Sequence, residues 1–384
     1  MKVLLIGIIV IFLFSCSSNP KNTIERNQEE LLIEKPQIDY KLNSLPKDIN
    51  VIYFFDSKIQ TTFPEEVKGL LTNYYLFSKK NRYFPNIKFI NLNAVSSCSI
   101  IINQDAYNLV FFLKDSVGNK PYNLCLNRLA NKDTLIISDF DNQSLPTNYK
   151  IFLVNRNDDK YELLRFMNSY SNYAMIIDNE VTEDKYEIGE FWKREFNKEI
   201  AEYRTFNSTE SSQEIFSNML LSVQSLKRKR KLSRIISKDL EHKLRTRQDI
   251  DALFLSVSTQ EARSLKPALD YNYFEGMDVF LANDWEDSFL FLKADKDLEG
   301  IVSIDIPFML QTPLPDDLGS LKNKSRNFAI GYDAFEVVLL LKGTRNLDRT
   351  IYKGLTGNIT FENKKIQRKS TIFKIKNGDY EYLN

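Results

Sequence analysis

Residues 243–283 read KLRTRQDIDALFLSVSTQEARSLKPALDYNYFEGMDVFLAN, and this stretch decides the fold. The apolar runs at 252–257 and 278–281 have the length and composition of buried strands, and residues 259–271 between them have helical periodicity. A strand, a helix and a second strand at this spacing predict a right-handed crossover between parallel strands. The stretch therefore indicates an α/β fold in which helices cover a parallel sheet.

The same alternation extends over most of the chain. Further strands are expected at 50–55, 87–92, 108–113, 133–138, 149–154, 173–177 and 200–206, and further helices at 64–79, 160–170, 183–198 and 213–229. Nine strands are too many for one small doubly wound sheet, so we expect two Rossmann-like lobes with parallel sheets and helices on both faces. Residues 359–362 and 366–376 predict that the chain ends in β-hairpins.

The composition excludes several classes of protein. Among 384 residues, 52 Lys and Arg balance 51 Asp and Glu, which argues against a surface built to hold nucleic acid. His242 is the one histidine, so a two-histidine metal site or a histidine relay is excluded. No phosphate-binding loop, dinucleotide fingerprint or nucleophile motif occurs, so no cofactor, metal or catalytic residue is predicted.

The first twenty residues, MKVLLIGIIVIFLFSCSSNP, predict export. Lys2 precedes an apolar run that is too short to span a membrane, which indicates a signal peptide over residues 1–15. The run ends at Leu13-Phe14-Ser15-Cys16, which is similar to a bacterial lipobox, so Cys16 is the expected lipidation site. The alternative is an ordinary signal peptide with a cysteine there by chance. Similarity to bacterial lipoproteins implies acyl chains such as palmitate on Cys16, and Ser17 favours the outer membrane, facing the periplasm.

Residues 16–48 are polar and rich in Asn, Lys and Glu, which predicts a flexible tether before a folded domain over 49–384. Removal of residues 1–15 takes Lys2 and leaves 51 basic and 51 acidic residues. Cys98 and Cys125 remain in the domain. In an oxidising periplasm they could form a disulfide, and buried free thiols are an equal alternative.

The strongest charge feature begins at Lys227, Arg228, Lys229, Arg230 and Lys231 and continues to Arg247, with ten basic and two acidic residues in all. It has three interpretations: a patch for nucleic acid or an anionic membrane, a solvated helical excursion, or a docking surface for an acidic partner. Export removes nucleic acid as a partner. The acidic groups at 284–287, Asp139 with Asp141, and Asp158 with Asp159 are expected to be solvated rather than catalytic, and His242 is expected at the surface.

Several segments together resemble the LppC (LpoA) family of outer-membrane lipoproteins, which activate a class A penicillin-binding protein. They are Arg247-Gln248-Asp249, Asp251-Ala252-Leu253-Phe254, Gln260-Glu261-Ala262-Arg263, Lys266-Pro267, Asp297-Leu298-Glu299-Gly300-Ile301, Asp305-Ile306-Pro307-Phe308, Gly331-Tyr332-Asp333-Ala334 and Gly354-Leu355-Thr356-Gly357. The resemblance is good over residues 200–384 and rests on the strand–helix order over 49–200. The family's helical repeat domain has no counterpart here, because only the tether stands in its place.

The resemblance implies a type I periplasmic-binding-protein fold, with two lobes joined by crossover strands around a cleft. Lobe 1 is expected over about 49–154 and 320–352, and lobe 2 over about 155–319 and 353–384. It also implies a non-enzymatic role: binding and activating a peptidoglycan synthase, a class A penicillin-binding protein. Lys227–Lys231 are the candidate docking residues for that partner.

A second hypothesis is a lipid-anchored solute-binding protein for an amino acid or a peptide. Its ligand would lie in the cleft, for which the candidate residues are Asp56, Ser57, Ser138, Asp139 and Asp141. Asp56-Ser57 stands where binding proteins of this fold commonly carry a Ser-Gly turn that touches the ligand, so this chain departs from the pattern there.

Overall fold

The structure is a computed structural model, and the part of the chain that it describes lies between residues 38 and 383. The described ranges are 38–54, 64–92, 106–113, 133–139, 150–154, 157–170, 172–178, 182–207, 209–241, 247, 249–271, 277–282, 296–311, 314–319, 321, 324–344, 347, 350–362 and 365–383. None of the helices in these ranges combines the length and the apolar composition needed to cross a membrane.

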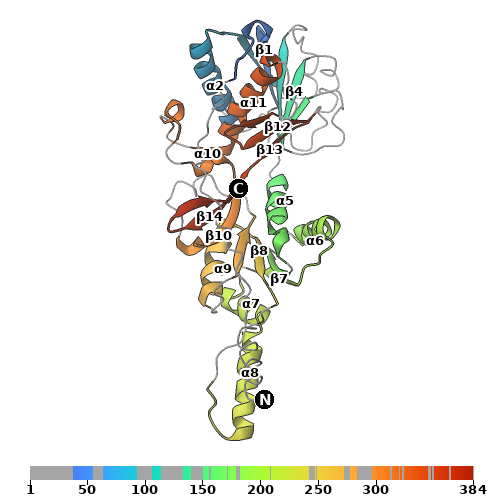
Figure 1. Cartoon of the computed structure of the whole chain (residues 1–384), viewed down its shortest axis with the longest axis vertical. Coiled ribbons are helices and arrows are strands. Elements are labelled where there is room, and N and C mark those ends of the chain that lie inside the picture. The colour runs from blue at the N-terminus through green and yellow to red at the C-terminus, as the bar shows by residue number, and fades with distance from the viewer. Residues whose placement is uncertain are drawn as a thin grey trace, which may run out of the picture.

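Lobe 1 is built on an eight-stranded sheet of order β11-β12-β13-β5-β4-β3-β1-β2. Its strands are β1 (Asp48–Phe54), β2 (Asn86–Leu92), β3 (Tyr107–Phe112), β4 (Thr134–Ser138), β5 (Lys150–Leu153), β11 (Ile351–Lys353), β12 (Asn358–Glu362) and β13 (Lys365–Lys369). The strands from β2 to β13 run parallel, and β12 and β11 add an antiparallel edge. Figure 1 shows this lobe at the upper end of the molecule.

Two helices, α2 (Glu65–Asn81) and α11 (Arg326–Gly343), pack on the lobe 1 sheet and on each other. They approach so closely that a Cβ on Gly331 of α11 would lie 1.8 Å from the carbonyl oxygen of Glu66, and a Cβ on Gly69 would lie 1.9 Å from that of Phe328. Side chains of α11 enter two cores, because Phe328 and Tyr332 belong to a cluster with lobe 2 while Phe335 belongs to the lobe 1 cluster.

Lobe 2 is built on a seven-stranded sheet of order β15-β14-β10-β9-β8-β6-β7. Its strands are β6 (Tyr173–Asp178), β7 (Glu202–Phe206), β8 (Ala252–Ser256), β9 (Asp278–Leu281), β10 (Ile301–Asp305), β14 (Thr371–Lys376) and β15 (Asp379–Tyr382). Strands β7 to β10 are parallel, and β14–β15 form a terminal antiparallel hairpin, as the sequence predicts.

Helices cover both faces of the lobe 2 sheet. Alternate residues of β8 face opposite ways: Leu253 and Leu255 join a core with α7 (Ser212–Met219) and α9 (Thr259–Tyr271), whereas Phe254 joins a core with α5 (Asn157–Phe166) and α6 (Thr182–Phe196). Because successive side chains point to opposite faces, one continuous apolar run supplies residues to the cores on both sides of the sheet. The α/β class and the two lobes are therefore as predicted.

Two sequence predictions of single elements are wrong. The helix expected over 213–229 is two helices, α7 and α8 (Ser222–Ile236), because Leu221 adopts a left-handed conformation with φ of 58° and turns the chain between them. The strand expected over 366–376 is also two strands. Ser370 separates β13, in the lobe 1 sheet, from β14, in the lobe 2 sheet. Residues 353–362 and 365–369 therefore lie with lobe 1 and not with lobe 2 as expected.

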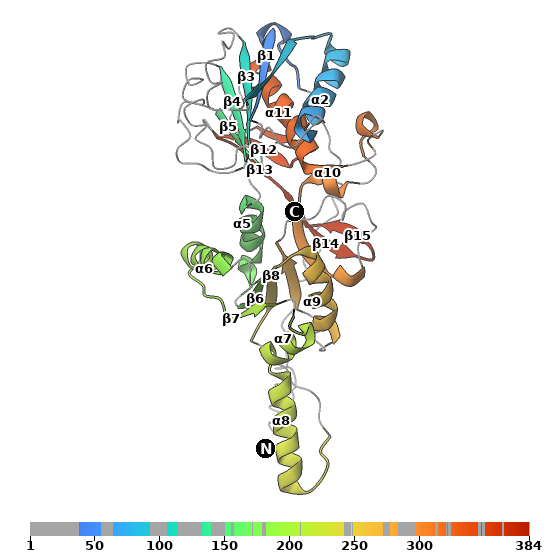
Figure 2. The ribbon, with the colours of Figure 1, turned by 180° about the vertical axis from the view of Figure 1, so that it is seen from behind.

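Between its described helices and strands, the chain thus crosses from one lobe to the other three times. It crosses from β5 to α5, from β10 through α10 (Pro307–Leu310) to α11, and from β13 to β14. Figure 2 shows these segments converging between the two sheets.

The Gly331 contact gives a direct test of the α2–α11 packing. Gly331→Ala forces two helix backbones apart, so we expect it to lower the free energy of unfolding by about 3 kcal/mol or more in urea titration. The matched control is Gly189→Ala in α6, where the nearest atom to a new Cβ is Ile200 Cδ1 at 3.5 Å. That change should be neutral or stabilising by up to ~1 kcal/mol. Equal effects at the two positions would contradict the packing described.

Candidate functional site

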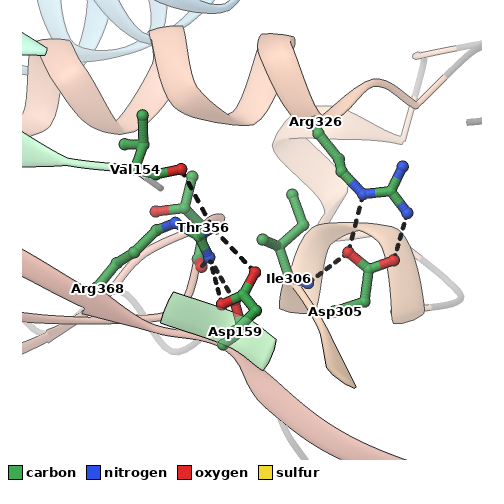
Figure 3. A network of polar contacts seen from close by, with 8 residues as sticks. Val154, Asp159, Asp305, Ile306, Arg326, Thr356 and Arg368 are labelled. Atoms are coloured by element: carbon green, nitrogen blue, oxygen red, sulfur yellow. Dashed lines mark hydrogen bonds and ion pairs between the residues drawn. The ribbon is translucent and has the colours of Figure 1, made fainter. Parts of the chain in front are cut away.

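The convergence of the three crossings is the candidate site, and Arg368 of β13 holds one side of it (Figure 3). Its guanidinium forms an ion pair with Asp159 of α5, with Nη2 and Oδ2 3.1 Å apart. It also donates to the carbonyl oxygen of Val154, at 3.3 Å, to that of Thr356, at 3.4 Å, and to the hydroxyl of Ser370. One buried side chain therefore joins the end of β5, the turn after β11, a lobe 2 helix and the β13–β14 switch.

A second ion pair holds the crossing from β10 to α11. Arg326, the first residue of α11, donates from Nη2 to Oδ2 of Asp305 at 2.5 Å and from Nε to Oδ1 at 3.0 Å. Asp305 ends β10, and its Oδ1 also accepts the backbone N–H of Ile306 at 2.7 Å. The two side chains are only 8% and 4% exposed, so this bidentate pair is removed from water.

A third carboxylate, Asp333 in the middle of α11, organises the turn after β11. Its Oδ1 accepts the N–H of Leu355 at 3.0 Å, and its Oδ2 accepts the N–H of Thr356 at 2.7 Å and the Thr356 hydroxyl at 2.6 Å. Complete burial raises the pKa of Asp333 to about 6, although the three hydrogen bonds oppose that rise. The same turn presents the Thr356 carbonyl oxygen to Arg368, so the helix and the crossings are connected.

This arrangement can fix the lobes relative to one another. Binding proteins that close on a solute do so by flexing the segments between their lobes. Here the three crossings carry two buried arginine–aspartate pairs, and moving the lobes would separate charges in a low-dielectric interior. Among the described residues no group of His, Cys, Asp or Glu is arranged to hold a metal ion.

The expected cleft residues are only partly within the described chain. Ser138 is buried at the end of β4, and its carbonyl oxygen accepts the N–H of Val154 at 2.8 Å, next to the first crossing. Asp139 follows it directly. Asp56, Ser57 and Asp141 lie outside the described residues, as do Cys16, Cys98, Cys125, His242 and the acidic group 284–287. A ligand site in the cleft therefore stays a prediction.

The predicted docking residues Lys227, Arg228, Lys229, Arg230 and Lys231 all lie on α8, far from the lobe junction (Figure 1). Within the described chain, Lys229 is the member of this group with an ion pair, to Asp239 at 3.5 Å. The other four are exposed.

Sequence reasoning missed the junction residues and misjudged one of them. Asp159 was expected to be a solvated acid, but its side chain is 17% exposed and pairs with Arg368. Its role was missed because two adjacent acids, Asp158 and Asp159, suggest a solvated surface segment. Arg326 and Arg368 stand among other surface-type residues, and only the topology shows that they meet Asp305 and Asp159.

Comparisons with known proteins agree with this architecture. The model of the family described as "LppC putative lipoprotein" matches residues 187–378. The C-domain of LpoA (YraM) from Haemophilus influenzae, a regulator of PBP1A, is similar in structure with a TM-score of 0.57 at 12% identity. That similarity covers 88% of this chain and 100% of the domain.

Other solved structures show the same fold. Full-length LpoA from Haemophilus influenzae has a TM-score of 0.57 at 11% identity, with 88% of this chain covered, and the chain spans 59% of it. A "putative branched-chain amino acid ABC transporter" from Chromobacterium violaceum has a TM-score of 0.56 at 15% identity, with 85% of this chain and 99% of that one covered. No curated protein sequence matches the chain.

The Asp305–Arg326 pair can be tested by a double-mutant cycle. Arg326→Met leaves a buried carboxylate without its partner, so we expect a loss of about 3–5 kcal/mol of unfolding free energy, part of which Asp305→Leu in the same chain restores. The matched control is the more exposed Arg165–Glu162 pair, 2.6 Å apart, where Arg165→Met should cost no more than ~1 kcal/mol. A cost at Arg326 as small as the control's would exclude a stabilising junction.

Asp333 predicts a specific dependence of stability on pH. Its folded-state pKa of about 6 lies above the ordinary value of 3.8, so the folded chain binds more protons than the unfolded chain between these values. Its contribution to stability is thus full below pH 4 and declines by about 3 kcal/mol as the pH rises through 6. Relative to Asp333→Asn, the natural chain should lose that amount between pH 4 and 7 in urea titrations. Asp316→Asn at an exposed position should give a curve parallel to the natural chain's, and the same parallel curve from Asp333→Asn would refute the assignment.

Proposed function

Because the chain belongs to the LppC family, we propose that it is a non-catalytic regulator that binds and activates a class A penicillin-binding protein. The observation that carries the proposal is the structural similarity to the entire C-domain of LpoA, which is itself a regulator of PBP1A. The described body of this chain corresponds to that domain.

The junction ion pairs favour a regulator over a protein that closes on a solute. Activation requires that the regulator bind the active conformation of the synthase more tightly than the inactive one. A body whose lobes are held in one arrangement offers one fixed surface, so its binding energy is not consumed in ordering itself. Buried pairs such as Asp305–Arg326 supply that rigidity.

A lipid anchor at Cys16 would place this body in the periplasm on the outer membrane. The supporting observations are the lipobox-like end of the signal peptide and membership of a family of lipoproteins. This chain spans 59% of the full-length relative. The predicted tether over 16–48 is too long, because Ile38, Tyr40 and Leu45 pack in the lobe 1 core. Reach toward a synthase in the inner membrane would therefore depend on the residues before Ile38.

The alternative is a lipid-anchored solute-binding protein for an amino acid or a peptide. It is supported by the structural similarity to the Chromobacterium violaceum transporter protein, which is nearly as close as that to LpoA. The two hypotheses differ in what they require of the junction, because solute closure needs the crossings to move.

The decisive experiment uses a fragment from residue 37 onward. Each residue of the three hydrophobic clusters lies between Ile38 and Leu383, so this fragment keeps all three clusters. Added to a class A penicillin-binding protein from the same cell, it should increase the rates of glycan polymerisation or crosslinking and bind the synthase in a pull-down. In cells, Cys16→Ala should release the full-length chain from the outer-membrane fraction.

The control is the same fragment carrying Arg326→Met, in which the junction is broken. We expect this variant to activate less than the natural fragment at temperatures where both remain folded. If the natural fragment neither binds nor activates any class A synthase, while leucine or another amino acid raises its melting temperature, the solute-binding hypothesis replaces the regulator.

A further inference from the structure

Helix α8 projects from the end of lobe 2 that is remote from lobe 1, beyond α7, in both views of the molecule (Figures 1 and 2). Its base is firmly built. The backbone N–H of Arg247 donates to the carbonyl oxygen of Leu220 at 3.0 Å, and the Arg247 guanidinium contacts Glu202 of β7 at 2.7 Å and Asp249 at 2.6 Å. The left-handed Leu221 directs α8 away from the body. These contacts fix the position of the helix base, so the projection of α8 is part of the fold.

The charge of α8 has one sign. The helix reads SVQSLKRKRKLSRII and contains six basic residues and no acidic one. Lys227, Arg230, Lys231 and Arg234 are three or four residues apart, so they lie along one side of the helix. Of the six basic side chains, Lys229 is the one with an ion pair in the described chain, to Asp239.

Large aliphatic side chains lie on the same helix, next to this basic side. Leu226, Leu232, Ile235 and Ile236 are between 41% and 69% exposed, and they are four of the eleven exposed large hydrophobic side chains of the described chain. Leu232 stands three and four residues before Ile235 and Ile236, so these three form an apolar strip. Adjacent exposed apolar side chains of this kind mark a surface that contacts a partner or a membrane rather than water alone.

We propose that α8 binds an anionic phospholipid surface. Lysine and arginine side chains keep their charged ends at the headgroups while their aliphatic stems, with Leu232, Ile235 and Ile236, enter the boundary with the acyl chains. A cluster of six basic residues on one helix matches the charge density that attracts proteins to anionic lipid. This contact is independent of the proposed regulation of a synthase.

An acidic protein surface would satisfy the charges but not the apolar strip. The strip lies on a single projecting helix, so a protein partner would need an apolar groove ringed by acids to cover it. A fluid bilayer surface moulds itself around a convex helix without such a match. The combination of exposed leucine and isoleucine with lysine and arginine therefore favours lipid.

The test is co-sedimentation of the fragment from residue 37 onward with vesicles at ~100 mM salt. Vesicles of phosphatidylethanolamine with one third phosphatidylglycerol should bind it, and phosphatidylcholine vesicles should not. Lys227→Gln, Arg230→Gln and Lys231→Gln together should lower the partition coefficient about 100-fold. Leu232→Ser with Ile235→Ser should lower it at least about 10-fold, because two aliphatic side chains then stay in water.

Matched control variants remove the same chemistry elsewhere: Lys79→Gln with Lys80→Gln at the exposed end of α2, and Ile351→Ser, whose side chain is 60% exposed on β11. They should bind as the natural fragment does, and circular dichroism should show all variants folded. The proposal fails if anionic vesicles do not bind the fragment, or if α8 variants bind like the controls. It also fails if only the charge variant loses binding and polyglutamate competes fully, because α8 is then a docking site for an acidic protein. Synthase activation by the same fragment is a separate measurement, so either proposal can fail alone.

Discussion

The arrangement of the two lobes depends on arginine side chains buried where the chain passes from one sheet to the other. A crossing leaves backbone carbonyl groups that neither sheet can pair, and a buried unpaired carbonyl is costly. Arg368 answers this constraint with donors to the carbonyls of Val154 and Thr356 while its charge is balanced by Asp159. At the crossing into α11, Asp305 and Arg326 balance each other's charge, and Oδ1 of Asp305 also accepts the N–H of Ile306.

The consequence is a body in which helix α11 belongs to both halves. Its first turn is tied to the end of β10, its middle carboxylate organises the turn that also contacts Arg368, and its last turns pack in the lobe 1 core with α2. A displacement of one lobe against the other must therefore disturb the two ion pairs, Asp305–Arg326 and Asp159–Arg368. Such coupling favours one arrangement over a freely moving hinge.

Local pattern predicted nine strands well, gave no prediction for β10 or for the full length of α11, and predicted the connections between sheets poorly. The nine expected strands all occur within two residues of their predicted ends, because buried strands are short apolar runs that need no knowledge of their neighbours. The division at Ser370 was not predicted, since no glycine or proline separates β13 from β14, although the two strands pair in different sheets. Asp159 and Arg368 are 209 residues apart, and no periodicity links them.

The segments that carry the family resemblance contain the residues that connect the main elements of the structure. Asp305-Ile306-Pro307-Phe308 contains one partner of a junction ion pair, Gly331-Tyr332-Asp333-Ala334 contains the close helix contact and the buried carboxylate, and Arg247-Gln248-Asp249 clamps the base of α8. The motifs of the family thus account for the fold and for the contacts that stabilise it. The exposed residues of α8 lie outside these motifs, so the binding partner of this surface follows from its own basic and apolar side chains.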